Sequence, residues 1–482
     1  MTCREVRIQA LKEDGVELLI PRISRSSPHL APLCLAAGDT NIQDFTLQLS
    51  SQSPRARSLR PAISIMTFKK HGRKYDVVVF GATGYTGQFA AEHIATHLPS
   101  NLRWAVAGRS ESKLQTVVAD CEKLNPDRVQ PEVEICNLND RDLQELAKKT
   151  FVLISAVGPY GKYGEHAFKA CAENGTHYFD VTGEVPFVAK MISEYGKAAQ
   201  ASGALMFPEV GLESAPPDLM TWAMAKLIRE KLSAKTGEVT VAIHTLDAAP
   251  SGGTLATVLT LLDNFSMQEV KASFRPYALS PIPNPTRAPS RDTILTKIFG
   301  ARHVPELGTV TTSLAGTTDA AIVQRSWGLH TSLNEQESYG PNFSFKEYFR
   351  VRNLLHGVFV HIALFLGIII LGTPLRHVAH RFVYQPGQGP AKADSKKDRV
   401  EYRATAIPDV TPKSDKIAFG RLWFDGSMYD LSGMMMAQGA LSLLEDNLEL
   451  PGGVYTASCL GQKFVDRVGD AGLKMEVKLM TP

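Results

Sequence analysis

The 482-residue chain lacks any pair of cysteines at a spacing that suits a metal site or a redox disulfide. Its six cysteines are scattered, and no C-x-x-C motif occurs. We therefore predict no metal centre and no disulfide framework, and we expect a reducing compartment. The chain also has no large excess of one charge, since it contains 52 Lys and Arg residues and 49 Asp and Glu residues. This balance gives no argument for a nucleic-acid partner, although the slight basicity leaves an anionic surface open.

The first 65 residues contain no continuous apolar run, so we expect no secretory signal there. Ser, Pro and Arg are common, and neither a helical nor a strand period persists. We therefore predict a disordered N-terminal extension over 1–70. A mitochondrial transit peptide stays open because Arg and Ser are common, but Glu5, Glu13, Asp14 and Glu17 argue against it. Alternatively, translation starts at Met66, which leaves a short basic segment before the first predicted strand.

The glycine-rich stretch GATGYTG, residues 81–87, follows the apolar run Tyr75–Phe80 and precedes an amphipathic run over 88–98. The first run suits a buried parallel strand and the second a helix. Glycines at such a strand-to-helix turn predict a dinucleotide site, because they allow a sharp turn, a close pyrophosphate and tight helix packing. The helix N-terminus would bind the phosphates. The spacing is G-x-x-G-x-x-G, so a glycine turn of another α/β fold is the alternative.

Arg109 ends a second apolar run, where an NAD site usually has an acidic residue for the ribose hydroxyls. A carboxylate would repel a 2′-phosphate, whereas Arg109 would bind one, with help from Ser110 and Lys113. We therefore predict NADP(H) as the cofactor. An ordinary exposed cation at a strand end is the alternative for Arg109.

Three further strands follow, and the fourth of the series ends before Val157 and Gly158, which we expect to face the nicotinamide. The alternation of strands and helices predicts a Rossmann domain over 71–185. The predicted cofactor-binding residues are Gly81, Ala82, Thr83, Gly84, Tyr85, Thr86, Gly87, Arg109, Ser110, Lys113, Val157 and Gly158.

A different pattern begins near residue 186. Alternating strands, a Pro-rich loop and long helices predict a second α+β domain with a mixed sheet over 186–482. Within it, Asp218 precedes a helical pattern, so we expect it to cap that helix, with a functional role as the alternative. The fold class is therefore α/β, with a Rossmann domain followed by an α+β domain that carries the substrate site.

The segment 354–371 carries no charged residue apart from its histidines, His356 and His361. It is just short of a membrane-spanning length. It shows almost no polar face, and basic residues flank it, which favours a helix or hairpin that dips into a membrane or lipid-droplet monolayer. A buried core helix is the alternative.

Several motifs occur in one order: VVVFGATGYTGQ, AVAGRSESKL, SAVGPYGKYGE, YFDVTGE, VGLESAPPDL and SGGT. In this order the chain resembles the saccharopine dehydrogenase-like oxidoreductases, in particular their lipid-droplet-associated members and the bacterial trans-acting enoyl reductases. Glu213 departs from the family pattern, which commonly has Asp there. The resemblance implies an NADP(H)-dependent oxidoreductase that reduces an enoyl or keto group of a lipid or other hydrophobic substrate. It also supports a lipid-droplet or intracellular membrane location facing the cytosol. The N-terminal composition leaves the mitochondrion open, and a homodimer stays open as well.

A reductase needs a proton donor near the developing charge. By position only, Tyr160, Tyr163 and Asp180 are the candidate catalytic residues, although packing suits Tyr160 better and a turn-fixing hydrogen bond suits Asp180 better. Two other functions stay open. One is a non-catalytic membrane or lipid-droplet protein with a Rossmann scaffold, and the other is saccharopine metabolism in the lysine pathway, which would need several converging Arg or Lys residues.

Overall fold

The computed structural model describes residues 9–13, 16–20, 68–247, 252–284, 294–371, 373 and 397–482. The chain divides into two units, 1–63 and 64–482. In the first unit, β1 (Gln9–Glu13) and β2 (Val16–Ile20) pair as an antiparallel hairpin. These ten residues depart from the disorder predicted for 1–70. The rest of that prediction, up to residue 67, lies outside the described residues.

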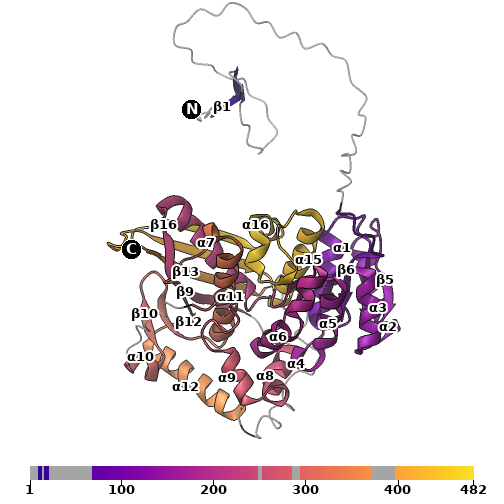
Figure 1. Cartoon of the computed structure of the whole chain (residues 1–482). Helices are drawn as coiled ribbons and strands as arrows, with labels where there is room; N and C mark the ends of the chain where they lie inside the picture. The colour runs from indigo at the N-terminus through magenta and orange to yellow at the C-terminus, as the bar shows by residue number, and fades with distance from the viewer. Residues whose placement is uncertain are drawn as a thin grey trace, which may run out of the picture. The chain divides into compact units, whose positions relative to one another are not determined.

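The second unit contains a parallel sheet of seven strands in the order β15-β8-β7-β6-β3-β4-β5 (Figure 1). The strands are β3 (Tyr75–Phe80), β4 (Trp104–Gly108), β5 (Glu132–Ile135), β6 (Thr150–Ser155), β7 (His177–Asp180), β8 (Leu205–Phe207) and β15 (Gly453–Val454). The chain runs outward from β3 to β5 and then returns to β6, so the strand order reverses between β3 and β6. Ligands of such sheets bind at this reversal. Two strands, β8 and β15, come from beyond residue 185, where we placed the end of the Rossmann domain.

Helices cover both faces of this sheet. They are α1 (Tyr85–His97), α2 (Glu111–Leu124), α3 (Asp140–Lys149), the short α4 (Tyr160–Tyr163), α5 (Glu165–Asn174) and α6 (Val185–Ser202). Val77 and Val79 of β3 pack on the side of α1 and α2, whereas Val78 and Phe80 pack on the side of α3, α5 and α6. This double burial explains why the strand is apolar apart from Asp76, whose buried carboxylate pairs with Arg103 and His71.

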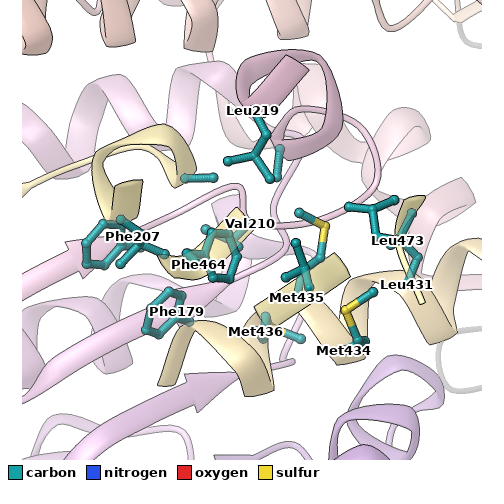
Figure 2. Close-up of a cluster of buried hydrophobic side chains, with 14 of the residues drawn as sticks. Phe179, Phe207, Val210, Leu219, Leu431, Met434, Met435, Met436, Phe464 and Leu473 are labelled. Atoms are coloured by element: carbon teal, nitrogen blue, oxygen red, sulfur yellow. The ribbon is translucent and has the colours of Figure 1, made fainter. Parts of the chain in front are cut away.

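The C-terminal part of the chain completes the first of these two faces. Helix α15 (Met428–Glu445) packs against α1, and a Cβ at Gly433 would lie 2.7 Å from the backbone nitrogen of Ala90. Figure 2 shows Met434–Met436 of α15 beside Phe179, Phe207 and Phe464, which come from β7, β8 and α16 (Gly461–Asp470). The two domains therefore share one hydrophobic core.

The second sheet also has seven strands, in the order β10-β11-β12-β9-β13-β14-β16. Its strands are β9 (Lys235–Leu246), β10 (Arg302–Val304), β11 (Gly308–Thr312), β12 (Ser344–Arg350), β13 (Arg399–Asp409), β14 (Ile417–Asp425) and β16 (Lys474–Met480). The pair β12 and β9 is parallel and the other pairs are antiparallel. The predicted mixed sheet of the second domain is confirmed.

The remaining described helices of this domain are α7 (Ala215–Leu232), α8 (Gly252–Asn264), α9 (Met267–Ser273), α10 (Ile294–Phe299), α11 (Gly316–Leu333), α12 (Leu354–Leu371), η1 (Glu335–Glu337) and η3 (Ala457–Leu460). The expectation that Asp218 caps a helix is wrong, because α7 begins three residues before it, after Ser214. Asp218 is buried, and its Oδ2 accepts the backbone N–H of Ser458 at 2.8 Å. Asp218 therefore ties α7 to η3.

Helix α12 lies on the outside of the second sheet beside α10, drawn in orange in Figure 1. The Oγ1 of Thr311 donates to the carbonyl oxygen of Gly357 at 2.8 Å, and Thr312 Oγ1 lies 2.8 Å from His361 Nδ1. One side of α12 is thus fastened to β11. None of the helices in the described ranges is both long and apolar enough to span a membrane.

Candidate active site

The glycine turn joins β3 to α1 at the reversal of strand order. Gly81 has φ +84°, which favours glycine, and a Cβ there would lie 2.6 Å from Val157 Cγ2. A Cβ at Gly87 would collide with the carbonyl oxygen of Gly81. Helix α1 begins after Gly84 without a side-chain cap and with no acidic residue in its first turn. Its backbone N–H groups and the positive end of its dipole therefore fit a pyrophosphate.

Arg109 follows β4 and Lys113 lies in the first turn of α2, on the adenosine side of the turn. Both side chains are exposed, both line the same cavity as the glycine turn, and neither has an ion-pair partner within the described ranges. Two unpaired cations beside the expected ribose fit a 2′-phosphate. Ser110 lies between them as the residue before α2, and its Oγ is 3.4 Å from Ser112 Oγ.

The cavity of about 1100 Å³ connects the two domains. Of the predicted cofactor-binding residues, nine line it: Gly81, Thr83, Gly84, Tyr85, Thr86, Arg109, Lys113, Val157 and Gly158. Ala82 and Gly87 are buried behind the turn, and Ser110 lies outside the lining. The contact of these residues with a cofactor stays a prediction. Beyond the turn, the cavity continues between β9, α8 and β12, where its lining is mostly apolar: Ile243, Leu246, Leu259, Leu261, Leu262 and Phe349.

The three candidate catalytic residues occupy different environments. Tyr160 lines the cavity, but it is buried and its Oη donates to the carbonyl oxygen of Ser155 at 2.9 Å. Tyr163 is half-buried and does not line the cavity.

Asp180 lies behind the cavity wall and accepts hydrogen bonds from Tyr178 Oη and from the backbone N–H groups of Thr182 and Glu209. It fixes the turn after β7, while burial raises its pKa to about 6. Neither Tyr163 nor Asp180 is therefore placed to meet a substrate in this cavity.

Two glutamates in the cavity wall were not among the predicted site residues. Glu184 follows β7, and its oxygens accept the backbone N–H groups of Tyr160 at 2.6 Å and Gly161 at 3.0 Å. Burial raises its pKa to about 7. Glu213 follows β8 and is half-buried, with a pKa that burial raises. Both residues stand in the quoted motifs YFDVTGE and VGLESAPPDL, so the sequence marked their segments but not their chemistry.

Three more carboxyl groups lie behind Glu213. Both carboxyl oxygens of Glu209 are buried without a partner among the described residues, and burial raises its pKa well above the ordinary value. Asp319 on α11 and Glu347 on β12 are buried near each other, and Asp319 Oδ2 and Glu347 Oε2 have no hydrogen-bond partner among the described residues. Burial raises both pKa values, to about 7 for Glu347. No group of three or more acidic, His or Cys residues that could hold a metal occurs in the described segments.

Comparison with known proteins decides the family. Residues 77–206 match the saccharopine dehydrogenase NADP-binding domain. A protein of Mycobacterium tuberculosis named as a trans-acting enoyl reductase is 30% identical over 423 residues, which cover 84% of this chain and 97% of that relative. The chain belongs to the saccharopine dehydrogenase-like oxidoreductase family. It is thus an NADP(H)-dependent oxidoreductase, and the predicted cofactor is confirmed.

Two further members of this family are similar to the chain. A saccharopine dehydrogenase-like oxidoreductase of Mus musculus is 42% identical over 156 residues, or 30% of this chain and 36% of that one. The solved apo saccharopine dehydrogenase (L-Glu forming) from Saccharomyces cerevisiae has 13% identity and a TM-score of 0.44, and the match covers 83% of this chain and 99% of that one. At that TM-score the likeness supports no conclusion about the reaction.

Substitution of Arg109 tests how this saccharopine dehydrogenase-like oxidoreductase selects its cofactor. We expect Arg109→Glu to weaken NADPH binding by about 10- to 100-fold, because a charge-assisted bond is lost and a repulsive carboxylate is added. NADH binding should change far less. Fluorescence titration with both dinucleotides measures the difference, and Arg141→Glu, at an exposed arginine of α3 outside the cavity, is the control for net charge. Equal losses for both cofactors would show that Arg109 does not contact the 2′-phosphate.

Proposed function

We propose that the protein uses NADPH to reduce a carbon–carbon or carbon–oxygen double bond in a hydrophobic, lipid-like substrate. The observation that carries the proposal is the course of the cavity, which runs from the glycine turn at Gly81 into an apolar half between β9, α8 and β12. Relatives named trans-acting enoyl reductases support reduction of an enoyl group.

Bound NADPH would supply the hydride for such a reduction. The glycine turn and the N-terminus of α1 would hold the pyrophosphate, and the backbone at Val157 and Gly158 would lie along the nicotinamide half. The apolar lining would bind the substrate chain and exclude water, which strengthens electrostatic interactions at the reacting atoms. Each of these roles belongs to residues that already line one cavity.

The lining argues against a saccharopine-like substrate. Arg109 and Lys113 are the only basic side chains among the described lining residues, and both lie at the dinucleotide end. The half beyond the turn has acidic side chains, Glu184 and Glu213, but no Arg or Lys in the part of the chain that the structure describes. A substrate with several carboxylates would find no counter-charge there.

We further propose that α12 rests on a lipid surface and that the substrate enters beside it. Leu355, Phe359, Ile362, Leu366 and Ile369 form one exposed stripe along α12, at helical spacing. Arg352 is exposed just before the helix, and α12 itself has no acidic residue. An exposed apolar stripe along a whole helix, with a basic residue at one end, suits an anionic lipid surface. Ile368 is 54% exposed and also lines the cavity, so the lipid-facing helix borders the substrate space.

The activity is tested by NADPH oxidation in the presence of lipid vesicles. We expect the purified protein to oxidise NADPH when the vesicles contain a long-chain enoyl or keto lipid, and to leave NADPH unchanged with the matching saturated lipid. NADH should be a poor substitute. If the protein binds NADPH but oxidises it with none of these lipids, the result would favour a non-catalytic scaffold instead.

The lipid contact has its own test. We expect Phe359→Asp to reduce binding to anionic vesicles by about 10- to 100-fold, because one aromatic side chain contributes about 1.5–3 kcal/mol when it leaves water. Phe359 is 71% exposed and does not line the cavity, so the melting temperature and NADPH affinity should persist. Vesicle flotation measures the binding.

Val410→Asp is the control, since Val410 is 40% exposed on the loop after β13. If the stripe instead covers a second copy of the chain, gel filtration should show a dimer that Phe359→Asp dissociates. Vesicle binding would then be unchanged, and that result would contradict the lipid proposal.

A further inference from the structure

We propose that Glu213 is the proton donor of the reduction, an inference that rests on the proposed function. Its carboxyl group lines the cavity between the nicotinamide end and the apolar half. Three neighbouring strands, β6, β7 and β8, end at this place and carry Gly158, Gly183 and Glu213 in the segments that follow them. An added Cβ at Gly183 would collide with Glu213 Oε2, so the carboxyl group lies directly against the backbone of the β7 turn.

The other acid and phenol groups near this point are already engaged. Both oxygens of Glu184 accept backbone N–H groups. Tyr160 donates to Ser155, and Tyr402 Oη donates to the carbonyl oxygen of Leu212 at 3.2 Å. The carboxyl group of Glu213 has no hydrogen-bond or ion-pair partner within the ranges that the structure describes. It is therefore free to bond to a substrate.

The charged and titratable groups that face Glu213 include no cation that would stabilise its carboxylate. They are Glu209 from its own loop, Asp319 from α11, Glu347 from β12 and Tyr402 from β13, and none of them is a cation. Burial of Glu213 raises its pKa, and any negative charge on these neighbours favours its neutral form further. A raised pKa favours the protonated form of the carboxyl group, which is the form that a general acid requires.

The step balances for an enoyl substrate. Bound NADPH would supply the hydride that adds to the β-carbon while the carbon–carbon double bond opens, and it would leave as NADP⁺. The O–H bond of Glu213 would break, and its proton would form the new C–H bond at the α-carbon, so that the substrate gains two hydrogen atoms. Glu213 would remain as a carboxylate that takes up a proton from water before the next turnover.

Glu213→Gln tests the donor directly. We expect turnover with the enoyl lipid to fall by about 100-fold or more, since the amide has no acidic proton. NADPH affinity and melting temperature should stay close to those of the unchanged protein. Glu213→Asp should recover much of the turnover and shift its pH profile, because it keeps an acid at the shorter reach that relatives commonly have. Wild-type turnover in Glu213→Gln would overturn the proposal.

A second measurement does not depend on the substrate. The oxidised nicotinamide carries a positive charge, so NADP⁺ bound beside Glu213 should stabilise the carboxylate form of Glu213 and favour the loss of its proton to solvent. We expect the ratio of NADP⁺ affinity to NADPH affinity to rise as pH increases. In Glu213→Gln the ratio should rise less, because Glu184 is then the remaining acidic side chain of the described cavity lining. If the ratio behaves as expected but no enoyl lipid is reduced, the proposed function fails while the position of Glu213 stands. If Glu213→Gln keeps the full pH dependence, Glu213 does not adjoin the nicotinamide.

Discussion

Replacement of Gly84 with valine is expected to lower NADPH affinity by about 100-fold or more, equivalent to about 2.7 kcal/mol, with the fold intact. Gly84 lines the cavity with an ordinary φ of −78°, and a Cβ there would lie 3.2 Å from the carbonyl oxygen of Gly81. Valine is therefore compatible with these backbone angles if the Gly81 carbonyl shifts slightly, but it fills the space through which a pyrophosphate reaches the N–H groups of α1. Calorimetric titration gives the affinity, and a melting curve reports on the fold.

Gly87 provides the comparison. A Cβ at this position would collide with the carbonyl oxygen of Gly81 and lie 2.9 Å from Ala82 Cα. Gly87→Val should therefore lower the melting temperature as well as the affinity, because the turn itself must move. A well-folded Gly84→Val variant with normal NADPH affinity would remove the turn from the cofactor site.

The largest expected effect on stability comes from Glu209→Gln. Glu209 is buried without a partner in the described part of the chain, and its pKa lies well above 4.5 in the folded protein. At a pH between 4.5 and the pKa of Glu209 in the folded protein, Glu209 loses its proton in the unfolded chain but keeps it in the folded chain. The free energy of unfolding therefore falls by about 1.4 kcal/mol per pH unit as pH rises above 4.5. Glutamine has no proton to lose, so the variant should gain stability over the wild type as pH increases.

Denaturant unfolding at pH 5 and pH 8 measures this gain. The free energies of unfolding of the two proteins should differ less at pH 5 than at pH 8, where Glu209→Gln should be the more stable protein. Glu184 and Glu347, with pKa values raised to about 7, act in the same direction but are common to both proteins. A variant that is less stable than the wild type at pH 8 would mean that Glu209 is ionised and paired in the folded state.

The Rossmann half of the fold could be predicted from local patterns. Val77–Phe80 is apolar throughout because both faces of the sheet are covered, and the glycines mark the turn that follows. Strand β15, by contrast, has only two residues, Gly453 and Val454, and becomes a strand only by pairing with β8. No window of sequence carries such a signal, because the hydrogen-bond partner lies in a distant part of the chain.

The acidic part of the site was missed for the same reason. Glu213, Asp319 and Glu347 come from a loop, a helix and a strand that only the folded chain brings together. An acidic residue in a loop or at the start of a helix is common in any sequence. Arg109 was easier to interpret, because its meaning depends on its distance from the glycine turn within one βαβ unit.

Helix α15 covers one face of the first sheet and β15 extends its edge, although both come from the C-terminal part of the chain. This arrangement has a consequence during synthesis. The ribosome releases β3 to β8 long before it reaches Met428, yet α1 and β7 are covered only when α15 arrives against Ala90 and Phe179. Until α15 is synthesised, we expect the nascent Rossmann domain to expose an apolar face to solvent. Exposed apolar surface of this kind promotes aggregation and is bound by chaperones. A premature stop codon before 428 would for this reason remove cofactor binding as well as the last helices, although the glycine turn itself had already been translated. It would also remove Tyr429, whose ring packs against Tyr85 of the turn.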